Sequence, residues 1–195
     1  MSFTFALNCY DLDCIRNNNK DEIIEVELIS KNLLSIPEEI FNLKNLGSLD
    51  LSSNSITTIP KEIGNLTNLV RLNLQVNGIT TIPKEIGNLK KLKKLVLHGN
   101  EISTLPKEIS SLKNLKLLEL SGNNISDIPK EIGENGIKDI PKEFENLTQL
   151  KTFNRISEIP KVLFNMKGLE ELYLNVNMIT AIPKEIGNLS KLKRL

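Results

Sequence analysis

The chain repeats itself, and its prolines show the length of the repeat. Pro37, Pro60, Pro83, Pro106 and Pro129 follow one another at four equal steps of 23 residues. The text around them is nearly copied, as a comparison of residues 57–66, 80–89 and 180–189 shows. A fixed period of about 20 to 50 residues predicts a stack of small structural units, in which each unit packs only against its neighbours.

Each unit carries the pattern L-x-x-L-x-L-x-x-N-x-I-x-x-I-P, with complete copies ending at five prolines. The L-x-L segment predicts a short strand whose leucines, such as Leu49 and Leu51, point inward while Asp50 points outward. Successive strands should pair in parallel and form one sheet along the concave side of the array.

The segment after the strand should turn back along the convex side. Proline suits the first turn of a short helix, because its missing N–H would be unpaired there anyway. Glu62 and its repeats fall in the same first turn, where negative charge is favourable. Ile63, Leu66 and Leu69 then follow at helical spacing and return to the core.

The unit Ile-Pro-x-x-Ile-x-x-Leu-x-x-Leu resembles the leucine-rich repeat family, from about residue 23 to 195. This 23-residue unit is similar to the repeats of the Ras-group intracellular proteins, which include the Scribble-like and Ras-suppressor-like families. It also resembles repeats of some bacterial surface or secreted proteins. The resemblance implies an α/β solenoid with a curved parallel sheet and short helices or 3₁₀ turns on its convex side. It also implies that the repeated Asn side chain lies inside and bonds to the loop backbone of its own and neighbouring coils.

The ends and the middle depart from the pattern. Residues 1–22 precede the array of 23–195 and are expected to form an N-terminal cap or loop segment, and Lys31 replaces the Asn of the first unit. The units at about 130–160 are shortened. We expect one long unit from Leu115 to Glu145, followed by a strand near 150–153. The last repeat is incomplete at Leu195, so the chain is expected to be a fragment or a truncated copy of a longer array.

Two cysteines, Cys9 and Cys14, precede the array. They could form a disulfide in an extracellular repeat protein, but the start of the chain lacks the basic and apolar regions of a secretion signal. Two reduced thiols in a cytoplasmic protein are therefore expected. They cannot complete a zinc site, because no second Cys/His pair is present.

Charge and composition exclude several classes of function. There are 25 Lys and Arg against 24 Asp and Glu, a net charge of +1, which gives no overall electrostatic case for nucleic acid or an anionic membrane. No stretch approaches the roughly 18 apolar residues of a membrane span. There is one His and no phosphate loop, metal cluster or nucleophile motif, so neither an enzyme, a cofactor nor a small-molecule substrate is expected.

The outward strand positions vary while the inward leucines hardly change, and we expect a protein partner to bind on this concave face. The candidate residues are Glu27, Asp50, Arg71, Asn73, Gln75, Lys94, Val96, His98, Glu119, Glu171 and Tyr173. The alternative interpretation is that these side chains are only solvated and that binding occurs at a loop or at the N-terminal region. His98 has no Ser, Cys or carboxylate pair at a catalytic spacing, so it should be a solvated side chain and not a general base.

The leading prediction is a non-enzymatic interaction scaffold. The resemblance to the Ras group implies an adaptor in intracellular signalling that binds a small GTPase or another signalling protein. Two alternatives stay open. Lys161-Val-Leu-Phe164 resembles the docking motif that protein phosphatase one recognises, which would make the chain a phosphatase-targeting subunit. A secreted host-binding or adhesion array is the other alternative.

Overall fold

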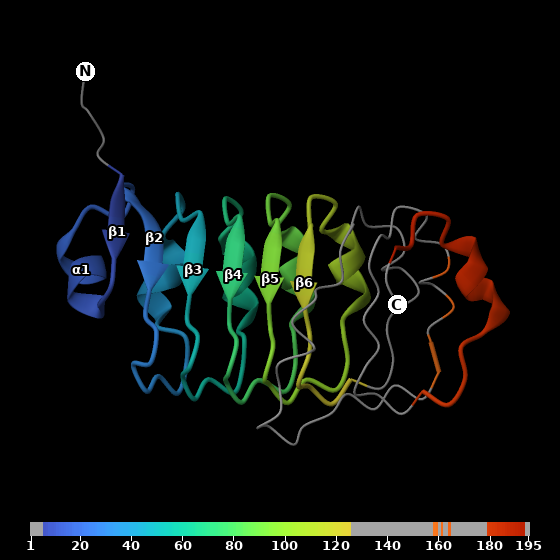
Figure 1. The fold of residues 1–195 in the computed structure, drawn as a ribbon. Coiled ribbons are helices and arrows are strands. Elements are labelled where there is room, and N and C mark those ends of the chain that lie inside the picture. The colour runs from blue at the N-terminus through green and yellow to red at the C-terminus, as the bar shows by residue number, and fades with distance from the viewer. Residues whose placement is uncertain (1–5, 126–157, 160, 162–163, 165–178, 194–195) are drawn as a thin grey trace.

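A computed structural model shows the predicted solenoid and describes residues 6–125, 158–159, 161, 164 and 179–193. Six strands form one parallel sheet in chain order: β1 (Leu7–Cys9), β2 (Ile23–Glu27), β3 (Ser48–Asp50), β4 (Arg71–Asn73), β5 (Lys94–Val96) and β6 (Leu117–Glu119). They lie side by side and point the same way, with the helices of the coils behind them (Figure 1).

Register in the sheet follows the 23-residue period. Leu49 pairs with Leu72, Leu72 with Leu95 and Leu95 with Leu118, so one column of leucines runs through the stack. These side chains are buried, and the other repeated Leu and Ile positions of the coils complete a single core. A core one coil wide needs uniform medium-sized side chains, which explains why aromatics make up only 4% of the chain.

The convex side is built from 3₁₀ helices, as predicted. They are η1 (Glu38–Asn42), η2 (Lys61–Asn65), η3 (Lys84–Asn88), η4 (Lys107–Ser111) and, near the C-terminus, η8 (Lys184–Asn188). In these five helices the proline precedes the first helical residue and does not lie within the first turn, a shift of one position from the prediction. The predicted acids, such as Glu62 and Glu85, do lie in the first turn.

The repeated asparagines behave as the resemblance implied. Asn100 accepts a hydrogen bond from the backbone N–H of Ile79 at 3.0 Å and donates to the carbonyls of Leu74 and Leu97 at 3.0 and 2.9 Å. Leu97 belongs to the same coil, whereas Ile79 and Leu74 belong to the preceding one. Asn54, Asn77 and Asn123 make the same kind of bonds. The amide therefore joins two coils because it carries donors and an acceptor together.

Residues 6–22 form the cap that closes the N-terminal end of the sheet. β1 pairs with β2, and α1 (Leu12–Asn17) is capped at its N-terminus by Asp11, whose carboxylate accepts a bond from the backbone N–H of Cys14 at 2.7 Å. The turn between β1 and α1 brings Cys9 and Cys14 together with a Cα–Cα separation of 5.5 Å, and they form a disulfide. The expectation of two reduced thiols was therefore wrong, because the chain reverses direction between them.

The shortened repeats predicted at about 130–160 lie mainly outside the described residues, as does the last strand leading to Leu195. The long unit from Leu115 to Glu145 and the strand near 150–153 therefore stay predictions. Near the C-terminus, η8 repeats the geometry of η2 and η3, with Pro183 before its first residue and Glu185 in its first turn.

Candidate functional site

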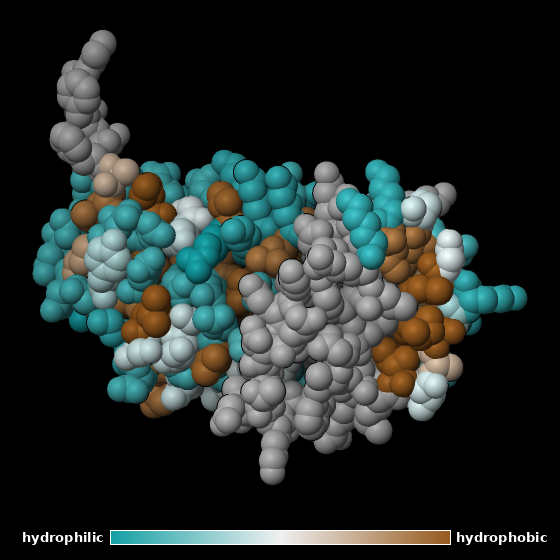
Figure 2. Space-filling model, in the orientation of Figure 1, coloured by the Kyte–Doolittle hydropathy of each residue, from teal (hydrophilic) through white to brown (hydrophobic). Residues whose placement is uncertain are grey.

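The outward positions of the sheet form three columns across the concave face. Register places Ser48 beside Arg71 and Arg71 beside Lys94, while the next column joins Asp50, Asn73 and Val96. The third column follows the strands and contains Gln75 and His98. In the N-terminal half of the view, hydrophilic residues dominate and hydrophobic ones are scattered among them (Figure 2).

A buried carboxylate holds part of this face in place. One oxygen of Asp50 accepts bonds from the backbone N–H and the hydroxyl of Ser52, at 3.0 and 2.6 Å. The other accepts from Arg71 at 3.0 Å and from the Asn73 amide at 2.8 Å. Burial by itself would raise the pKa of Asp50, but the bonds from Ser52 and Asn73 and the charge of Arg71 outweigh it, so the pKa lies below its usual value. Asp50 is therefore an ionised anchor that fixes the Arg71 guanidinium.

The sequence-predicted site residues do not all face solvent. Asp50 and Asn73 are each 4% exposed and Val96 is 8% exposed, so these three are corrected from surface positions to buried ones. Alternation in a strand predicts which side a residue faces, but it does not predict that residues of neighbouring strands will cover it. Lys94 is exposed, and the half-buried members are Glu27, Arg71, Gln75, His98 and Glu119. Glu171 and Tyr173 lie outside the described residues.

The sequence prediction missed two cavities beside the 3₁₀ helices. One, of about 560 Å³, lies between the coils of η1 and η2 and is lined in part by Phe41, Pro60 and Glu62. The other, of about 510 Å³, is lined by the corresponding Phe164, Pro183 and Glu185. Both contain a phenylalanine at the column where η2 and η3 have glycine.

The glycine column distinguishes the coils at these cavities from their neighbours. A Cβ on Gly64 would meet Glu85 of the next coil at 2.9 Å, and a Cβ on Gly87 would meet Glu108 at 2.8 Å. Adjacent helices therefore approach closely only where glycine is present, and Phe41 holds η1 away from η2. A comparison of residues 41, 64 and 87 at the 23-residue step would have revealed the difference.

Comparison with known proteins agrees with the repeat pattern. The family model described as "Leucine-rich repeat region" matches residues 26–99 and 83–195, which is most of the chain. The chain belongs to the leucine-rich repeat family. Domains of this family generally mediate protein–protein interaction and are generally non-catalytic.

Solved leucine-rich repeat structures are similar over nearly the whole chain. A leucine-rich repeat protein of Leptospira interrogans is 30% identical with a TM-score of 0.51, covering 95% of this chain and 56% of that one. The ectodomain of the Arabidopsis thaliana receptor kinase GASSHO1/SCHENGEN3, solved with CASPARIAN STRIP INTEGRITY FACTOR 2, is 29% identical with a TM-score of 0.75, covering 97% and 23%. The Arabidopsis HAESA ectodomain, solved with a peptide hormone, is 30% identical with a TM-score of 0.66, covering 89% and 29%. The chain thus spans about half or less of these proteins, and no curated protein sequence matches it.

In this leucine-rich repeat array, His98 has a partner that the sequence prediction missed. Its Nδ1 lies 3.1 Å from the hydroxyl of Ser121, which is the residue 23 positions later in the same column. Within the described part of the chain, no carboxylate is recorded on the other ring nitrogen. A serine and a histidine without an orienting acid lack the third group of a hydrolytic triad. The contact therefore links two coils of the sheet.

The phosphatase-docking motif is not presented as a surface ligand. Lys161 is exposed, but Phe164 is only 5% exposed and belongs to the core, while Val162 and Leu163 lie outside the described residues. A docking motif must offer its aromatic ring to the partner. The leucine-rich repeat therefore uses this phenylalanine for its own packing.

The described residues include neither a membrane-spanning helix nor a metal-binding cluster. None of the helices described is long and apolar enough to cross a membrane. No group of three or more His, Cys, Asp and Glu side chains in these ranges is arranged to hold a metal ion.

Proposed function

We propose that this chain is a non-enzymatic protein-binding module that holds a protein or peptide partner on the concave face of its leucine-rich repeats. The observation that carries the proposal is the group of accessible polar side chains around β4 and β5: Arg71, Gln75, Lys94 and His98. Arg71 is fixed by the buried Asp50, and the ring of His98 is held by the Ser121 hydroxyl, 3.1 Å from its Nδ1. Side chains that are already ordered lose less entropy when they bind.

The solved relatives support the same mode of action. The HAESA ectodomain was solved with a peptide hormone ligand, and the receptor RGFR1 with RGF2 is 28% identical with a TM-score of 0.67. These peptides are ligands of those receptors and are not assigned to the present chain. For the present chain, membership of the Ras group of leucine-rich repeat proteins and a small GTPase partner stay predictions.

The compartment is a separate question. The sequence predicts a cytoplasmic protein, but the Cys9–Cys14 disulfide favours an oxidising compartment, where such bonds persist. We therefore favour the secreted or surface-exposed array among the alternatives. Trapping free thiols with an alkylating reagent in intact cells, followed by mass spectrometry, tests this choice. Full alkylation of both cysteines in the native protein would return the prediction to the cytoplasm.

Site-specific photo-crosslinking tests the binding face. A benzoylphenylalanine at Gln75 lies on the concave side, and one at Asn65 lies at the exposed end of η2 on the opposite side. We expect a native partner to be captured from Gln75 and not from Asn65. Capture from Asn65 alone would contradict the concave-face proposal.

A further inference from the structure

Lysines gather at the edge of the sheet where the chain enters β5 and β6. We call this set the lysine ledge, and it consists of Lys90, Lys91, Lys93, Lys94, Lys113 and Lys116. All six side chains are exposed, and neither residues 90–94 nor residues 113–116 include an Asp or Glu. The matching segments of the preceding coils, residues 44–48 and 67–71, carry one lysine and one arginine between them, so the ledge is not a by-product of the repeat.

Hydrogen bonds of the backbone fix the spacing of these charges. Val70 O accepts from the N–H groups of both Lys93 and Lys94, at 2.8 and 3.1 Å. Lys93 O then accepts from Lys116 N at 2.9 Å, so Lys93 and Lys116 occupy the same column of neighbouring coils. Lys94 pairs in register with Arg71. Like charges at neighbouring positions of a sheet repel each other, and the backbone bonds keep the starting points of these side chains together.

The protein itself leaves much of this charge unpaired. Two ion pairs of the described ranges are Arg16–Glu39 and Arg71–Asp50, and neither uses Lys90, Lys91, Lys93, Lys94 or Lys116. Lys91 Nζ donates to the Asn68 side chain at 2.7 Å and Lys90 Nζ to the Ser111 carbonyl at 3.3 Å. Both are neutral acceptors. For Lys93, Lys94 and Lys116, the described structure records no side-chain bond.

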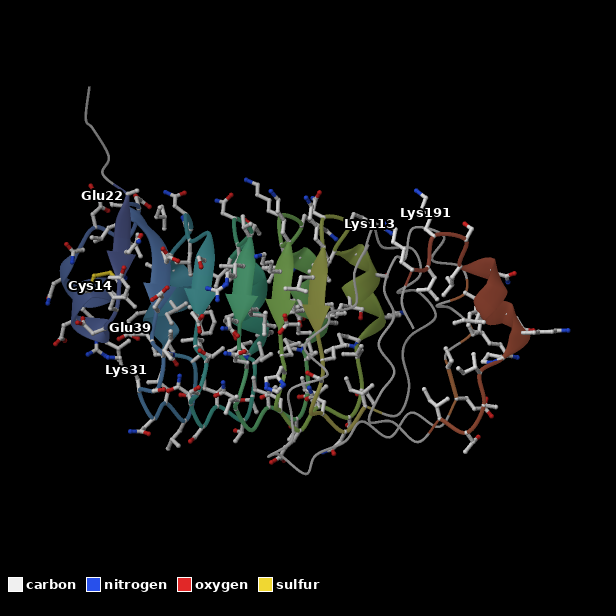
Figure 3. The ribbon with its side chains drawn as sticks, viewed as in Figure 1. Cys14, Glu22, Lys31, Glu39, Lys113 and Lys191 are labelled. Atoms are coloured by element: carbon white, nitrogen blue, oxygen red, sulfur yellow. A yellow bond between two sulfur atoms is a disulfide. The ribbon has the colours of Figure 1, made fainter. Side chains whose placement is uncertain are left out.

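Charge is divided along the array. Glu22 lies at the N-terminal end of the edge from which Lys113 and Lys191 project (Figure 3). On the concave face, Glu25 and Glu27 occupy β2, whereas Arg71 and Lys94 occupy β4 and β5. Glu119 in β6 is the acid closest in register to the ledge, and the six lysines outnumber it. A net charge of +1 for the chain therefore conceals an acidic end and a basic centre.

We propose that the ledge binds an acidic segment of the partner protein, which continues from the edge onto the concave face over β4 and β5. Lys94 and Arg71 carry the positive charge from the edge onto the face, where an extended peptide can follow it. The ledge also has no exposed aromatic residue for base stacking; Val70 is the exposed large hydrophobic residue beside it. The repulsion from Glu25 and Glu27 directs the acidic end away from β2. This inference rests on the proposed function and names the charge of its partner.

Fluorescence anisotropy with a labelled peptide of about ten glutamates tests the ledge. We expect the triple variant K93Q/K94Q/K116Q to bind this peptide about tenfold more weakly than the unchanged chain, with binding that weakens as salt is added. The control is K61Q/K84Q/K107Q, which removes the same charge from exposed positions of η2, η3 and η4. The control should change affinity by less than about twofold, and circular dichroism of both variants verifies their folding.

Several results would overturn the proposal. It fails if the glutamate peptide does not bind, if both triple variants lose the same affinity, or if phosphatidylserine vesicles or duplex DNA compete for these lysines more strongly than the peptide does. A peptide with glutamates in one half only tests the direction of binding along the array. A spin label at its acidic end should broaden the amide signals of Val96 and Leu118 more than that of Val26. The reverse order would also overturn it. If a partner crosslinks at Gln75 equally well with and without K93Q/K94Q/K116Q, the concave face is supported as the binding site. The proposal that the partner has an acidic segment on the ledge is then wrong.

Discussion

At the column of repeated asparagines the first coil carries Lys31, whereas the next four coils carry Asn54, Asn77, Asn100 and Asn123. At the glycine column the first coil carries Phe41, and the next two carry Gly64 and Gly87. Asn54 bonds the first coil to the second, but on its N-terminal side the first coil is held by contacts that do not repeat: a disulfide, the Asp11 cap and an exposed ion pair between Arg16 and Glu39 at 2.8 Å. The interior coils are thus stabilised by repetition, and the end of the array by individual contacts.

The largest difference is expected at the asparagine column. Asn100→Ala removes three strong hydrogen bonds to buried backbone groups and leaves those groups unpaired, so the free energy of unfolding should fall by about 3–5 kcal/mol in urea denaturation. The control is Lys31→Ala, at the same column of the first coil but exposed, which should change stability by less than about 0.5 kcal/mol. Equal effects would show that the first coil and the interior do not differ in this way.

The glycine column should give the next largest effect. Gly87→Ala places a Cβ against the backbone of η4 and should cost about 1–3 kcal/mol. Gly187→Ala is the matched control, because the same position in η8 has open space around it. Because alanine allows the unfolded chain fewer conformations than glycine, Gly187→Ala should raise the free energy of unfolding by about 0.4–1 kcal/mol. A tolerated Gly87→Ala would mean that the close approach of η3 and η4 is not needed.

The disulfide tests the non-repeating end. Closing so short a loop stabilises the chain by about 2 kcal/mol in the chain-entropy description, so reduction should lower the unfolding temperature and speed amide exchange in β1 and β2. The Cys9→Ala/Cys14→Ala variant provides the control, because added reductant should not change it further. If exchange accelerated equally in β5, the cap and the interior would unfold as one unit.

A strained residue offers a smaller change of opposite sign. Val76 has φ +53°, a conformation that β-branched residues avoid, while Gly99 and Gly122 occupy the next positions of its column. Val76→Gly should raise the free energy of unfolding by up to about 1 kcal/mol, as the strain relieved exceeds the entropy that glycine adds to the unfolded chain. Val70→Gly, at an exposed valine without positive φ, should instead destabilise. Destabilisation by both would indicate that Val76 packs favourably.

The smallest effect concerns acid. The pKa of Asp50 is lower in the folded chain than in the unfolded one, so its contribution to stability is present above the unfolded pKa of about 3.9 and is lost as the pH falls through the folded pKa. Thermal unfolding from about pH 6 to about pH 3 should therefore show a shallower decline in Asp50→Asn than in the unchanged chain. Parallel curves would show that Asp50 does not couple the interior coils to pH.

The repeat period was enough to predict the sheet, its register and the inward leucines, because each follows from a pattern that recurs. The replacement of Asn by Lys31 in the first unit and the acids in the first turns of the 3₁₀ helices could be predicted from the same pattern. The state of Cys9 and Cys14 was not, since the turn that brings them together belongs to the cap. The exposure of Asp50 and Asn73 depended on how neighbouring strands cover one another, and the period carries no information on that. The lysine ledge was hidden by a net charge taken over the whole chain.

The asparagine column also restricts how such a chain can change in length. Each internal amide bonds to the coil before it at fixed offsets, so an insertion or deletion inside a coil breaks the bonds on one side of that point. Removal or duplication of a whole coil leaves every amide with equivalent partners. The regular part of such an array is therefore expected to lengthen and shorten by whole copies of the unit, as the nearly identical segments 57–66, 80–89 and 180–189 suggest, whereas the shortened units at about 130–160 depart from this rule.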